Sequence, residues 1–486
     1  MLLRLPPRSA LPLLAGWLAF MVSLSCASGD HAAARPAHPP AASAPPATQH
    51  QQALREIYKE LIEIDTTEAR GNCTQAAQAM AARLRAAGFP AEDVQVLVHP
   101  GRATKGNLVA RLRGTGARRP LLLLAHLDVV EALRQDWSEG IDPFTLTERD
   151  GYFYGRGTTD DKARAAIFVA NLIRYKKEGF TPSRDLIVAL TADEEGGAHN
   201  GVAWLLASHR DRIDAEFGLN EGGDGHHRQG KRLFNGVQAS EKIFQSFSLE
   251  VRNKGGHSSL PAKDNAIYRL AAALDRLARF DFPVSLNEVT RAYFQRMSAI
   301  ESGQAAVDMK ALAAASPDPA AAARLSSSPY YNALMRTTCV ATQLQGGHAE
   351  NALPQTAKAI VNCRILPHEP LEEVQRTLVR VLADDQVRVE PVKQPKPSPP
   401  SPLRPEVMKP IEDVTRALWP GVPVIPLMGT GATDSLYFRR AGIPMYGVSG
   451  LFSDTDDERA HGKDERLGAS ALYEGQEFLY RLVKAL

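Results

Sequence analysis

Two short apolar segments that end in ionisable side chains constrain the fold more than any other feature of this chain. Residues 121–124 are four leucines, and His126 and Asp128 follow them. Residues 185–191 (DLIVALT) form a second run, and Glu194 lies just beyond it. Such continuous runs are typical of strands buried on both faces, as in parallel sheets covered by helices. Open α/β sheets carry their sites at the carboxyl ends of strands, so a functional site is expected where these runs end.

Helical and strand patterns alternate along most of the chain and predict an α/β fold. Near residue 240 the order changes to β-α-β-β-α-β, which indicates an inserted α+β domain of ferredoxin-like type. Its expected elements are strands at 244–251, 338–345, 356–366 and 386–392, helices at 265–280 and 371–382, and a long insertion at 281–331. The expected division is a catalytic domain in two parts, 53–239 and 396–486, with the second domain, 240–395, between them.

The first 27 residues have the features of a secretory signal peptide. Two arginines precede an apolar stretch at 11–24, and small residues surround a predicted cleavage after Ala27. An uncleaved membrane anchor and lipidation at Cys26 are the alternatives. Residues 28–52, rich in Ala, Pro, His and Gln, are expected to form a flexible linker. The protein is therefore expected to be secreted or periplasmic.

Charge and cysteine content argue against several classes of protein. The net charge is only +2, from 57 Lys and Arg against 55 Asp and Glu, which argues against a nucleic-acid partner. No apolar run after residue 30 is long enough to span a bilayer, so the mature chain is expected to have no membrane span. Cys73, Cys339 and Cys363 lack CxxC spacing and predict no thiolate metal site. Antiparallel pairing would place Cys339 near Cys363, which leaves a disulfide and two buried free thiols equally open.

Two motifs add carboxylates to the first histidine. Residues 155–162 (GRGTTDDK) combine turn-forming glycines with Asp160 and its neighbour before a predicted helix. Glu195 adjoins Glu194 in a Glu-Glu-Gly turn after the second apolar run. Each has an ordinary alternative, since an Asp pair can cap a helix and Glu-Glu-Gly is common in surface turns.

Two more residues complete a candidate metal site. Glu221 follows another short apolar run, and His461 lies in a loop before the last helix. Alone, each is best explained as a solvated loop residue. Together, two histidines and three or four carboxylates after strands of one sheet suit a pair of divalent cations, zinc above all. Paired cations polarise a carbonyl group and activate water.

The motifs, taken in order, resemble those of the co-catalytic zinc metallopeptidases, the family of aminoacylase, carboxypeptidase G, acetylornithine deacetylase and succinyl-diaminopimelate desuccinylase. They are H-x-D at 126–128, G-R-G-x-x-D-x-K at 155–162, E-E-G at 194–196 and G-G-H at 255–257. The resemblance covers residues 54–486. It implies a zinc-peptidase-like α/β catalytic domain with a mostly parallel sheet and an inserted ferredoxin-like lid, through which the family's dimer forms.

The resemblance also implies a cofactor and its ligands. The cofactor is two Zn²⁺ ions, with cobalt or manganese as substitutes. One zinc would be held by His126 and Glu221, the other by Glu195 and His461, and Asp160 would bridge them. Asp224 is the alternative if Glu221 lies elsewhere. The peptide bond that follows the bridging aspartate is expected to be cis.

Three residues have implied catalytic roles. Asp128 would orient the His126 ring, and Glu194 would be the general base. His257 would reach the partner subunit's active site and stabilise the oxyanion. For the substrate carboxylate, the resemblance implies Asn351, Arg364 and the glycine-rich loop that contains Gly431.

The sequence thus predicts a secreted dizinc metallohydrolase that cleaves a peptide or amide bond next to a residue with a free carboxylate, as a carboxypeptidase or dipeptidase. One alternative is an N-acyl-amino-acid amidohydrolase of the aminoacylase type. Another is a catalytically inactive peptide-binding protein on the same scaffold. The expected partners are a small peptide or N-acyl amino acid as substrate and a second copy of the chain in a homodimer.

Overall fold

The structure is a computed structural model that describes residues 48–394 and 396–486. The predicted signal peptide and most of the predicted linker lie outside the described residues. The linker prediction, 28–52, is wrong at its end, because helix α1 (Gln49–Glu63) begins earlier. Thr48 starts this helix with a capping box: its side chain accepts from the Gln51 N–H, and the Gln51 side chain accepts from the Thr48 N–H.

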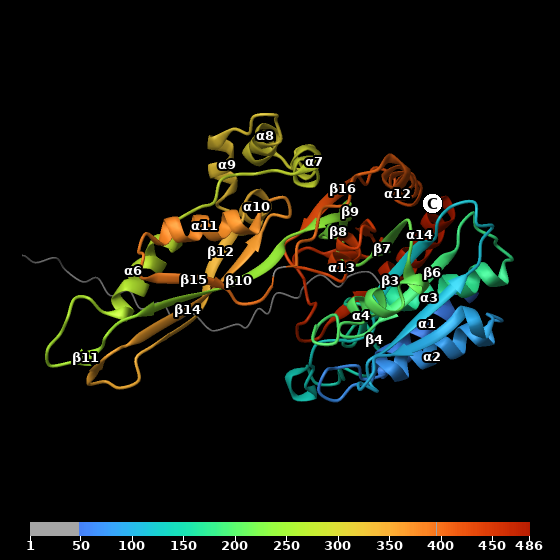
Figure 1. Ribbon diagram of the computed structural model, residues 1–486. Coiled ribbons are helices and arrows are strands. Elements are labelled where there is room, and N and C mark those ends of the chain that lie inside the picture. Colours follow the sequence, from blue (N-terminus) through green and yellow to red (C-terminus); the bar gives the residue numbers. More distant parts are fainter. Residues whose placement is uncertain (1–47, 395) are drawn as a thin grey trace, which may run out of the picture. The chain divides into compact units, whose positions relative to one another are not determined.

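The larger part of the described chain is built around a ten-stranded mixed sheet (Figure 1). Its strands follow the order β1 (Val94–Val98), β2 (Gly106–Leu112), β6 (Leu186–Thr191), β3 (Leu121–His126), β7 (Phe217–Asn220), β17 (Met445–Gly447), β9 (Lys231–Glu241), β8 (Gly225–Arg228) and β18 (Phe452–Asp454), and β16 (Val424–Gly429) also pairs with β9. The central strands β6, β3, β7 and β17 are parallel neighbours, and β1 and β2 are antiparallel. The predicted α/β class is confirmed.

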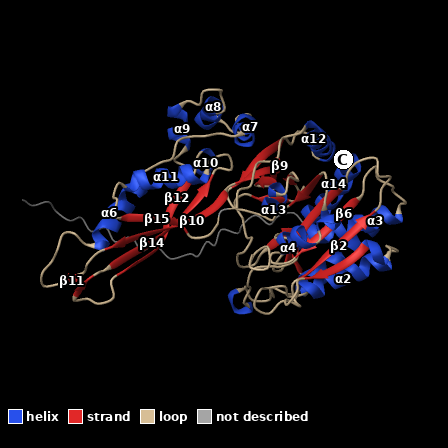
Figure 2. Cartoon of the chain, viewed as in Figure 1, coloured by secondary structure: helices blue, strands red, loops and turns tan. Residues whose placement is uncertain are grey.

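Alternate residues of the two apolar strands enter two different cores, because successive side chains of a strand point to opposite faces. Leu121 and Leu123 belong to the core under helices α1, α2 (Cys73–Ala86), α3 (Lys162–Lys177) and α14 (Ala469–Ala485). Leu122 and Leu124 belong to the core under α4 (Gly201–Ser208) and α13 (Ser435–Arg440). Helices therefore cover both faces of the sheet (Figure 2), as the continuous apolar runs predict.

A second sheet of four antiparallel strands follows the order β12 (Thr338–Gly346), β14 (Thr356–Ile365), β10 (Ile243–Arg252) and β15 (Val387–Pro391). Helices α6 (Ala266–Ala278) and α11 (Leu371–Leu382) share a separate hydrophobic core with it. We call these six elements the small α/β unit. Their chain order is the β-α-β-β-α-β expected from the sequence, and β15, which contains Pro391, lies at the sheet edge.

The insertion forms four helices: α7 (Glu288–Met297), α8 (Gly303–Leu312), α9 (Pro319–Leu325) and α10 (Pro329–Met335). Their buried residues belong to a core of the ten-stranded sheet and not to that of the small α/β unit; Phe294, for example, is fully buried there. Arg296 donates to the Val424 carbonyl on β16 at 2.8 Å and pairs with Glu412 of α12 (Pro405–Leu418) at 2.8 Å. The insertion therefore enlarges the core around the main sheet.

Cys339 on β12 and Cys363 on β14 form a disulfide, which resolves the alternative that the sequence left open. The two residues are direct cross-strand partners. Cys73 is a buried free cysteine.

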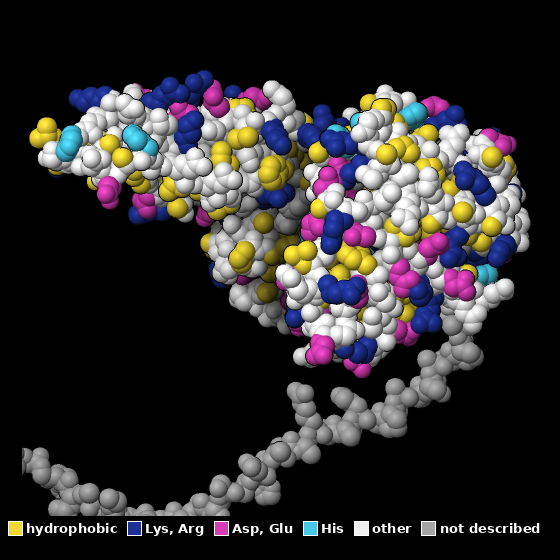
Figure 3. All heavy atoms as spheres, turned by 90° about the horizontal axis from the view of Figure 1, so that it is seen from below, with side chains coloured by type: hydrophobic (Ala, Val, Ile, Leu, Met, Phe, Trp, Pro, Cys, Tyr) yellow, Lys and Arg dark blue, Asp and Glu magenta, His cyan; other side chains and the backbone are white. Residues whose placement is uncertain are grey.

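None of the helices in residues 48–394 and 396–486 is long and apolar enough to cross a bilayer. On the face drawn in Figure 3, basic and acidic side chains are interspersed, in keeping with the small net charge.

Candidate metal and catalytic site

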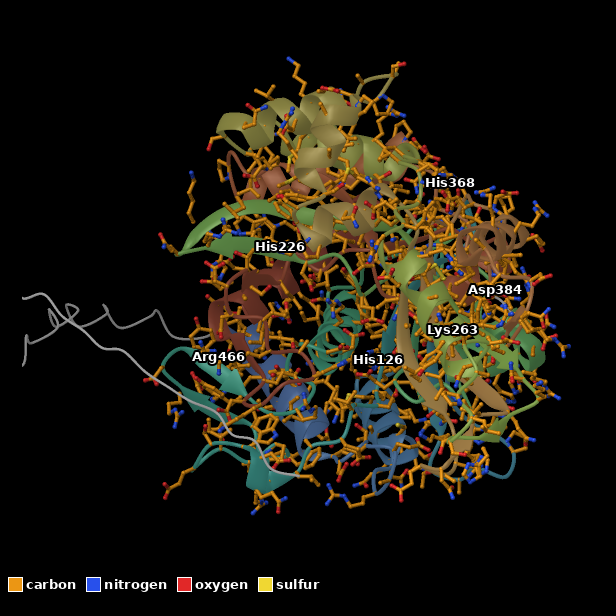
Figure 4. All side chains as sticks on the ribbon, turned by 90° about the vertical axis from the view of Figure 1, so that its left-hand side faces the viewer. His126, His226, Lys263, His368, Asp384 and Arg466 are labelled. Carbon is orange, nitrogen blue, oxygen red and sulfur yellow. A yellow bond between two sulfur atoms is a disulfide. The ribbon has the colours of Figure 1, made fainter. Side chains whose placement is uncertain are left out.

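The predicted metal ligands come from five segments of the chain outside the small α/β unit. His126, which is labelled in Figure 4, is the last residue of β3. Asp160 lies in the turn before α3. Glu195 and Glu221 follow β6 and β7, the two neighbours of β3, and His461 comes from the loop after β18. Parallel strands end at one edge of the sheet, and that edge gathers these side chains.

Asp160 stands between the two histidines. Its Oδ1 lies 2.9 Å from Nε2 of His126, and its Oδ2 lies 3.0 Å from Nε2 of His461. One carboxylate thus presents one oxygen to each imidazole, which is the arrangement that a bridging ligand requires. The peptide bond between Asp160 and Asp161 is cis, as the resemblance implies.

Each histidine has a second carboxylate beside it. Glu221 Oε2 lies 3.8 Å from Nε2 of His126, and Glu195 Oε1 lies 2.9 Å from Nε2 of His461. The Glu195 oxygen is buried and, despite this short distance, makes no hydrogen bond of acceptable geometry. A buried oxygen without a hydrogen bond is costly unless a ligand contacts it, so this oxygen is available to a cation.

The carboxylates of this cluster have no Lys or Arg partner among the described residues. Among the described residues, no Lys or Arg nitrogen lies within 4.0 Å of the carboxylates of Asp160, Glu194, Glu195 or Glu221. The hydrogen bond to Asp160 and the close carboxylate of Glu195 raise the pKa of His461 to about 10. Burial would lower the pKa of His126, but Asp160 and Glu221 outweigh it and raise that pKa well above its usual value.

The chemistry of this donor set fits divalent cations. His126 lies with Asp160 and Glu195, and also with Asp161 and Glu221, in groups whose potential ligand atoms are all within 4.8 Å of one another. Imidazole and carboxylate ligands suit zinc and neighbouring transition metals. Bound cations would replace the protons that the raised pKa values place on the imidazoles, since metal ligation requires neutral histidine.

Asp161 is not free to be a ligand, although it lies within reach. Its Oδ2 accepts from the His126 backbone N–H at 3.2 Å, and its Oδ1 is paired with Arg164. Arg164 also donates to Asp224 at 2.6 Å, so the sequence alternative to Glu221 is held by an arginine instead of facing His126. Burial, opposed by Arg164, raises the pKa of Asp161 to about 7. Arg164 is a site residue that the sequence analysis missed.

Asp128 contacts the His126 ring differently from the expectation. The ring Nδ1 lies 3.0 Å from the backbone carbonyl of Asp128, whereas the Asp128 carboxylate is 3.7 Å away. That carboxylate instead accepts the backbone N–H groups of Glu194 at 3.1 Å and Glu195 at 3.0 Å. Asp128 thereby fixes the histidine through its main chain and the Glu-Glu turn through its side chain.

Glu194 precedes Glu195 in the turn after β6, and the environment of its carboxyl group raises its pKa. Burial raises its pKa well above the usual value, and the nearby charges of Glu221 and Asp434 add to this effect. Asp434 is itself fully enclosed, accepts from Asn200 Nδ2 at 2.5 Å, and has its pKa raised to about 7 by burial. Asp434 and Asn200 are further residues that the sequence analysis did not single out.

The predicted substrate residues and His257 are not joined to this cluster by any contact among the described residues. His257 on β11 (Gly256–His257) and Asn351, next to β13 (Ala352–Leu353), lie side by side, with the Ser258 N–H donating to the Asn351 carbonyl at 3.0 Å. Arg364 lies on β14, over the Phe244 ring at 4.7 Å. Gly431 is exposed in the loop after β16.

Comparisons with known proteins agree with this geometry. Residues 122–485 match the peptidase family M20/M25/M40. The chain belongs to this family. It is 31% identical over 376 residues to an N-fatty-acyl-amino acid synthase/hydrolase PM20D1 from Xenopus tropicalis, a match that covers 75% of this chain and 72% of that protein. A probable carboxypeptidase S-like 2 from Dictyostelium discoideum is 29% identical, over 75% of this chain and 71% of that protein.

A solved structure supports the fold. The M20 family metallo-carboxypeptidase Sso-CP2 from Sulfolobus solfataricus superposes with a TM-score of 0.64 at 16% identity, covering 90% of this chain and 99% of that one. Family membership confirms the resemblance drawn from the motifs. As a member of this family the chain is a metallopeptidase or amidohydrolase.

The geometry makes a prediction about metal content. His126→Ala and His461→Ala should each lose one of two tightly bound divalent ions, because each imidazole serves a different side of Asp160. Metal content after dialysis, measured by mass spectrometry of the elements, tests this. His227→Ala, a change on β8 outside the cluster, should retain both ions. Equal loss in all three variants would contradict the assignment.

Proposed function

We propose that the protein is a dinuclear metal hydrolase that cleaves the amide bond between an acyl group and an amino acid with a free carboxylate. The single observation that carries the chemistry is Asp160, whose two oxygens face two imidazoles, each with a further carboxylate beside it. In this proposal His126 and Glu221 would hold one ion and Glu195 and His461 the other, and Asp160 would contribute to both. When bound, the ions would supply a polarised water and charge for the carbonyl oxygen.

Glu194 is the proton carrier in this mechanism. Its raised pKa, caused by burial, suits a group that takes a proton from water and returns it to the departing amine. Bound cations would lower this pKa again, because they favour the carboxylate form. Asp128 holds the backbone of Glu194 and so keeps this carboxylate at the cluster.

Glu194→Gln should lower kcat by about 10²- to 10⁴-fold, the usual contribution of a general acid–base group. The metal content should remain that of the wild type, because Glu194 is not one of the proposed ligands. Steady-state kinetics on metal-loaded protein, together with metal analysis, make this test. Unchanged kcat in a fully loaded variant would rule out the proposed role and revive the inactive-binder alternative.

A cavity with mostly apolar walls, whose lining shares no residue with the metal cluster, supports the choice of substrate. A cavity of about 540 Å³ is lined by apolar side chains, among them Phe244, Ile360 and Leu436, and by Lys242, Lys393 and Lys396. Its described lining includes no carboxylate. Burial lowers the pKa of Lys242 to about 7, and its Nζ donates to the Arg336 carbonyl at 2.6 Å, so Lys393 and Lys396 supply the positive charge of this wall. These walls suit a ligand with an apolar body and a negative end, as in an N-acyl amino acid.

Arg364 is the proposed partner of the substrate carboxylate. It stacks over Phe244 of the cavity wall, and no described carboxylate lies within 4.0 Å of its guanidinium. Burial lowers the pKa of Arg364, and a bound carboxylate would supply an opposite charge beside its guanidinium. Asn351 and the loop around Gly431 are proposed to bind the same end of the substrate.

Arg364→Ala should raise KM for N-acyl amino acids about 10- to 100-fold, the worth of a charge-assisted hydrogen bond. Substrates whose carboxylate is replaced by an amide should be turned over poorly by the wild type and no worse by the variant. Arg388→Ala, at an exposed arginine of β15, is the matched control and should keep the wild-type KM. If Arg364→Ala affects both substrate types equally, the proposed contact is wrong.

Carboxypeptidase action is the second candidate, favoured by the carboxypeptidase S-like relative. Both reactions require the same cluster and a free carboxylate, and they differ in the acyl side. Comparing kcat/KM for dipeptides with that for N-acyl amino acids of increasing chain length decides between them. A cavity with apolar walls favours the acylated substrates.

The compartment and the metal identity are also proposals. Export through the predicted signal peptide is supported by the Cys339–Cys363 disulfide, because disulfides persist in oxidising compartments. Zinc is proposed as the native metal on ligand chemistry, with cobalt and manganese as substitutes.

A homodimer through the small α/β unit is proposed from its exposed edge. Strand β12 has only one strand neighbour, and Val340 and Leu344 on it are 61% and 66% exposed. Tyr268 on the adjacent helix α6 is 63% exposed. An unprotected edge with apolar side chains is a template for pairing with another chain. In such a dimer, His257 of the partner subunit would act at the active site.

Leu344→Asp should convert the dimer to a monomer, because it places a charge in the proposed interface. Light scattering should give a mass near twice the 52.8 kDa of the full chain, less any removed leader, for the wild type and half of that for the variant. Val379→Asp, at an exposed residue of α11, should remain dimeric. If the wild type is monomeric, or both variants remain dimers, this interface is wrong.

A further inference from the structure

Glu465 is a fully buried carboxylate that the sequence analysis did not assign. Its Oε1 accepts from the Thr159 N–H at 2.7 Å, the Thr159 hydroxyl at 2.8 Å and the Asp160 N–H at 3.2 Å. Its Oε2 accepts from Arg156 Nη1 at 2.7 Å and the Gly157 N–H at 3.1 Å. Both oxygens are thus occupied by the loop that carries the proposed bridging ligand.

Arg156 extends this contact to the second histidine. Its Nη2 donates to the backbone carbonyls of His461 at 3.3 Å and Gly462 at 3.0 Å. The guanidinium is buried and therefore ties the Glu465 side chain to the backbone that precedes it. Glu465 and His461 are four residues apart, so one short segment supplies both a ligand side chain and the anchor for the opposite loop.

The His461 backbone needs such support. Its φ is +61°, in the left-handed region that residues with a Cβ seldom adopt. This conformation aims Nε2 at Asp160 Oδ2 and Glu195 Oε1, at 3.0 and 2.9 Å. A backbone held in a sparsely populated region persists only where the surroundings determine it, and here the Arg156 contact to the His461 carbonyl does so.

We propose that Glu465 is a positioning residue for the metal pair. Together with Arg156, it holds the loop of Asp160 and the loop of His461 at the distance at which both side chains can contact the same ion. This proposal rests on the metal site proposed above. Glu465 is not itself a ligand, because both of its oxygens are used by backbone, hydroxyl and guanidinium donors. Its effect on the metals is through the two loops.

Glu465→Gln tests the proposal. The amide keeps the size of the side chain, but its NH₂ group faces N–H donors whichever way it turns, so one side of the clamp is lost. Competition with a chromogenic chelator, using Zn²⁺ alone, should show a dissociation constant about 10- to 100-fold higher for at least one ion. Excess Zn²⁺ should restore most of kcat, which a damaged active site would not allow.

Asp308→Asn is the matched control for lost stability. Asp308 is another buried carboxylate paired with an arginine, accepting from Arg324 at 2.7 and 2.9 Å, but it lies in the helical insertion. The Asp308→Asn substitution should lower the melting temperature of the protein without changing its Zn²⁺ affinity. If Glu465→Gln lowers the melting temperature but binds Zn²⁺ like the wild type, or if Asp308→Asn loses as much affinity, the positioning role is overturned.

Thr159→Val replaces Glu465→Gln as the test in case the Glu465→Gln variant does not fold. It removes one of the five hydrogen bonds to Glu465 and preserves side-chain size. Its Zn²⁺ dissociation constant should rise about 2- to 10-fold, the worth of one hydrogen bond, and wild-type affinity would overturn the proposal. A wild-type protein that binds no Zn²⁺ would instead overturn the proposed metal site itself.

Discussion

The arrangement of the whole site depends on one carboxylate that faces two imidazoles. Asp160 can present one oxygen to each of His126 and His461 only if the turn before α3, the end of β3 and the loop after β18 meet within hydrogen-bond distance. The chain supplies no Lys or Arg to this cluster within the described residues, although basic side chains are numerous elsewhere. A concentration of buried negative charge without basic partners is unfavourable unless cations bind. The fold therefore brings together a set of ligands whose negative charge is balanced either by protons on the two imidazoles or by bound cations.

Three buried carboxylates that are not proposed ligands position the turns that carry the ligands, and each does so through backbone N–H groups. Asp128 accepts from the turn that carries Glu194 and Glu195. Asp161 accepts from the N–H of His126, and Glu465 accepts from the loop of Asp160. An ionised acceptor bonds a backbone N–H more strongly than a neutral one does. The ligand side chains are thus fixed at their main chain and remain free to contact the ions.

The sequence predicted most of the fold because the informative signals are local. The apolar runs at 121–124 and 185–191, the alternation from Phe244 to Val251 and the helical spacing of α11 each reflect burial of one segment. The strand pairing that sets Cys339 opposite Cys363 was open, because register depends on a turn and on a bulge between Ala341 and Gln343. The insertion was unassigned because its helices are completed by contacts with β16 and α12.

The candidate site was predictable to the extent that its residues lie at strand ends or in compact motifs. The sequence could not tell which group of Asp128 contacts the His126 ring, because a main-chain carbonyl and a side-chain carboxylate two residues from a histidine have the same sequence signature. Glu465 was missed for a different reason. The contacts of Glu465 join residues more than 300 positions apart, and no local pattern records such a pairing. A carboxylate four residues after His461 is visible in the sequence, but its partners are visible only in the fold.

The division into separate hydrophobic cores has a consequence for catalysis. His126 ends a strand of the ten-stranded sheet, and the other proposed ligands and Glu194 lie in turns and loops outside the segment 243–391. Arg364, His257 and Asn351 lie within that segment, part of which has a core of its own. A shift of the small α/β unit would change contacts with the substrate carboxylate without moving Asp160 or either imidazole. The metal cluster can therefore remain rigid, as preorganised catalysis requires, while substrate binding involves the separately packed unit. The metal cluster and the proposed carboxylate-binding residue Arg364 can behave differently because they are packed on different hydrophobic cores.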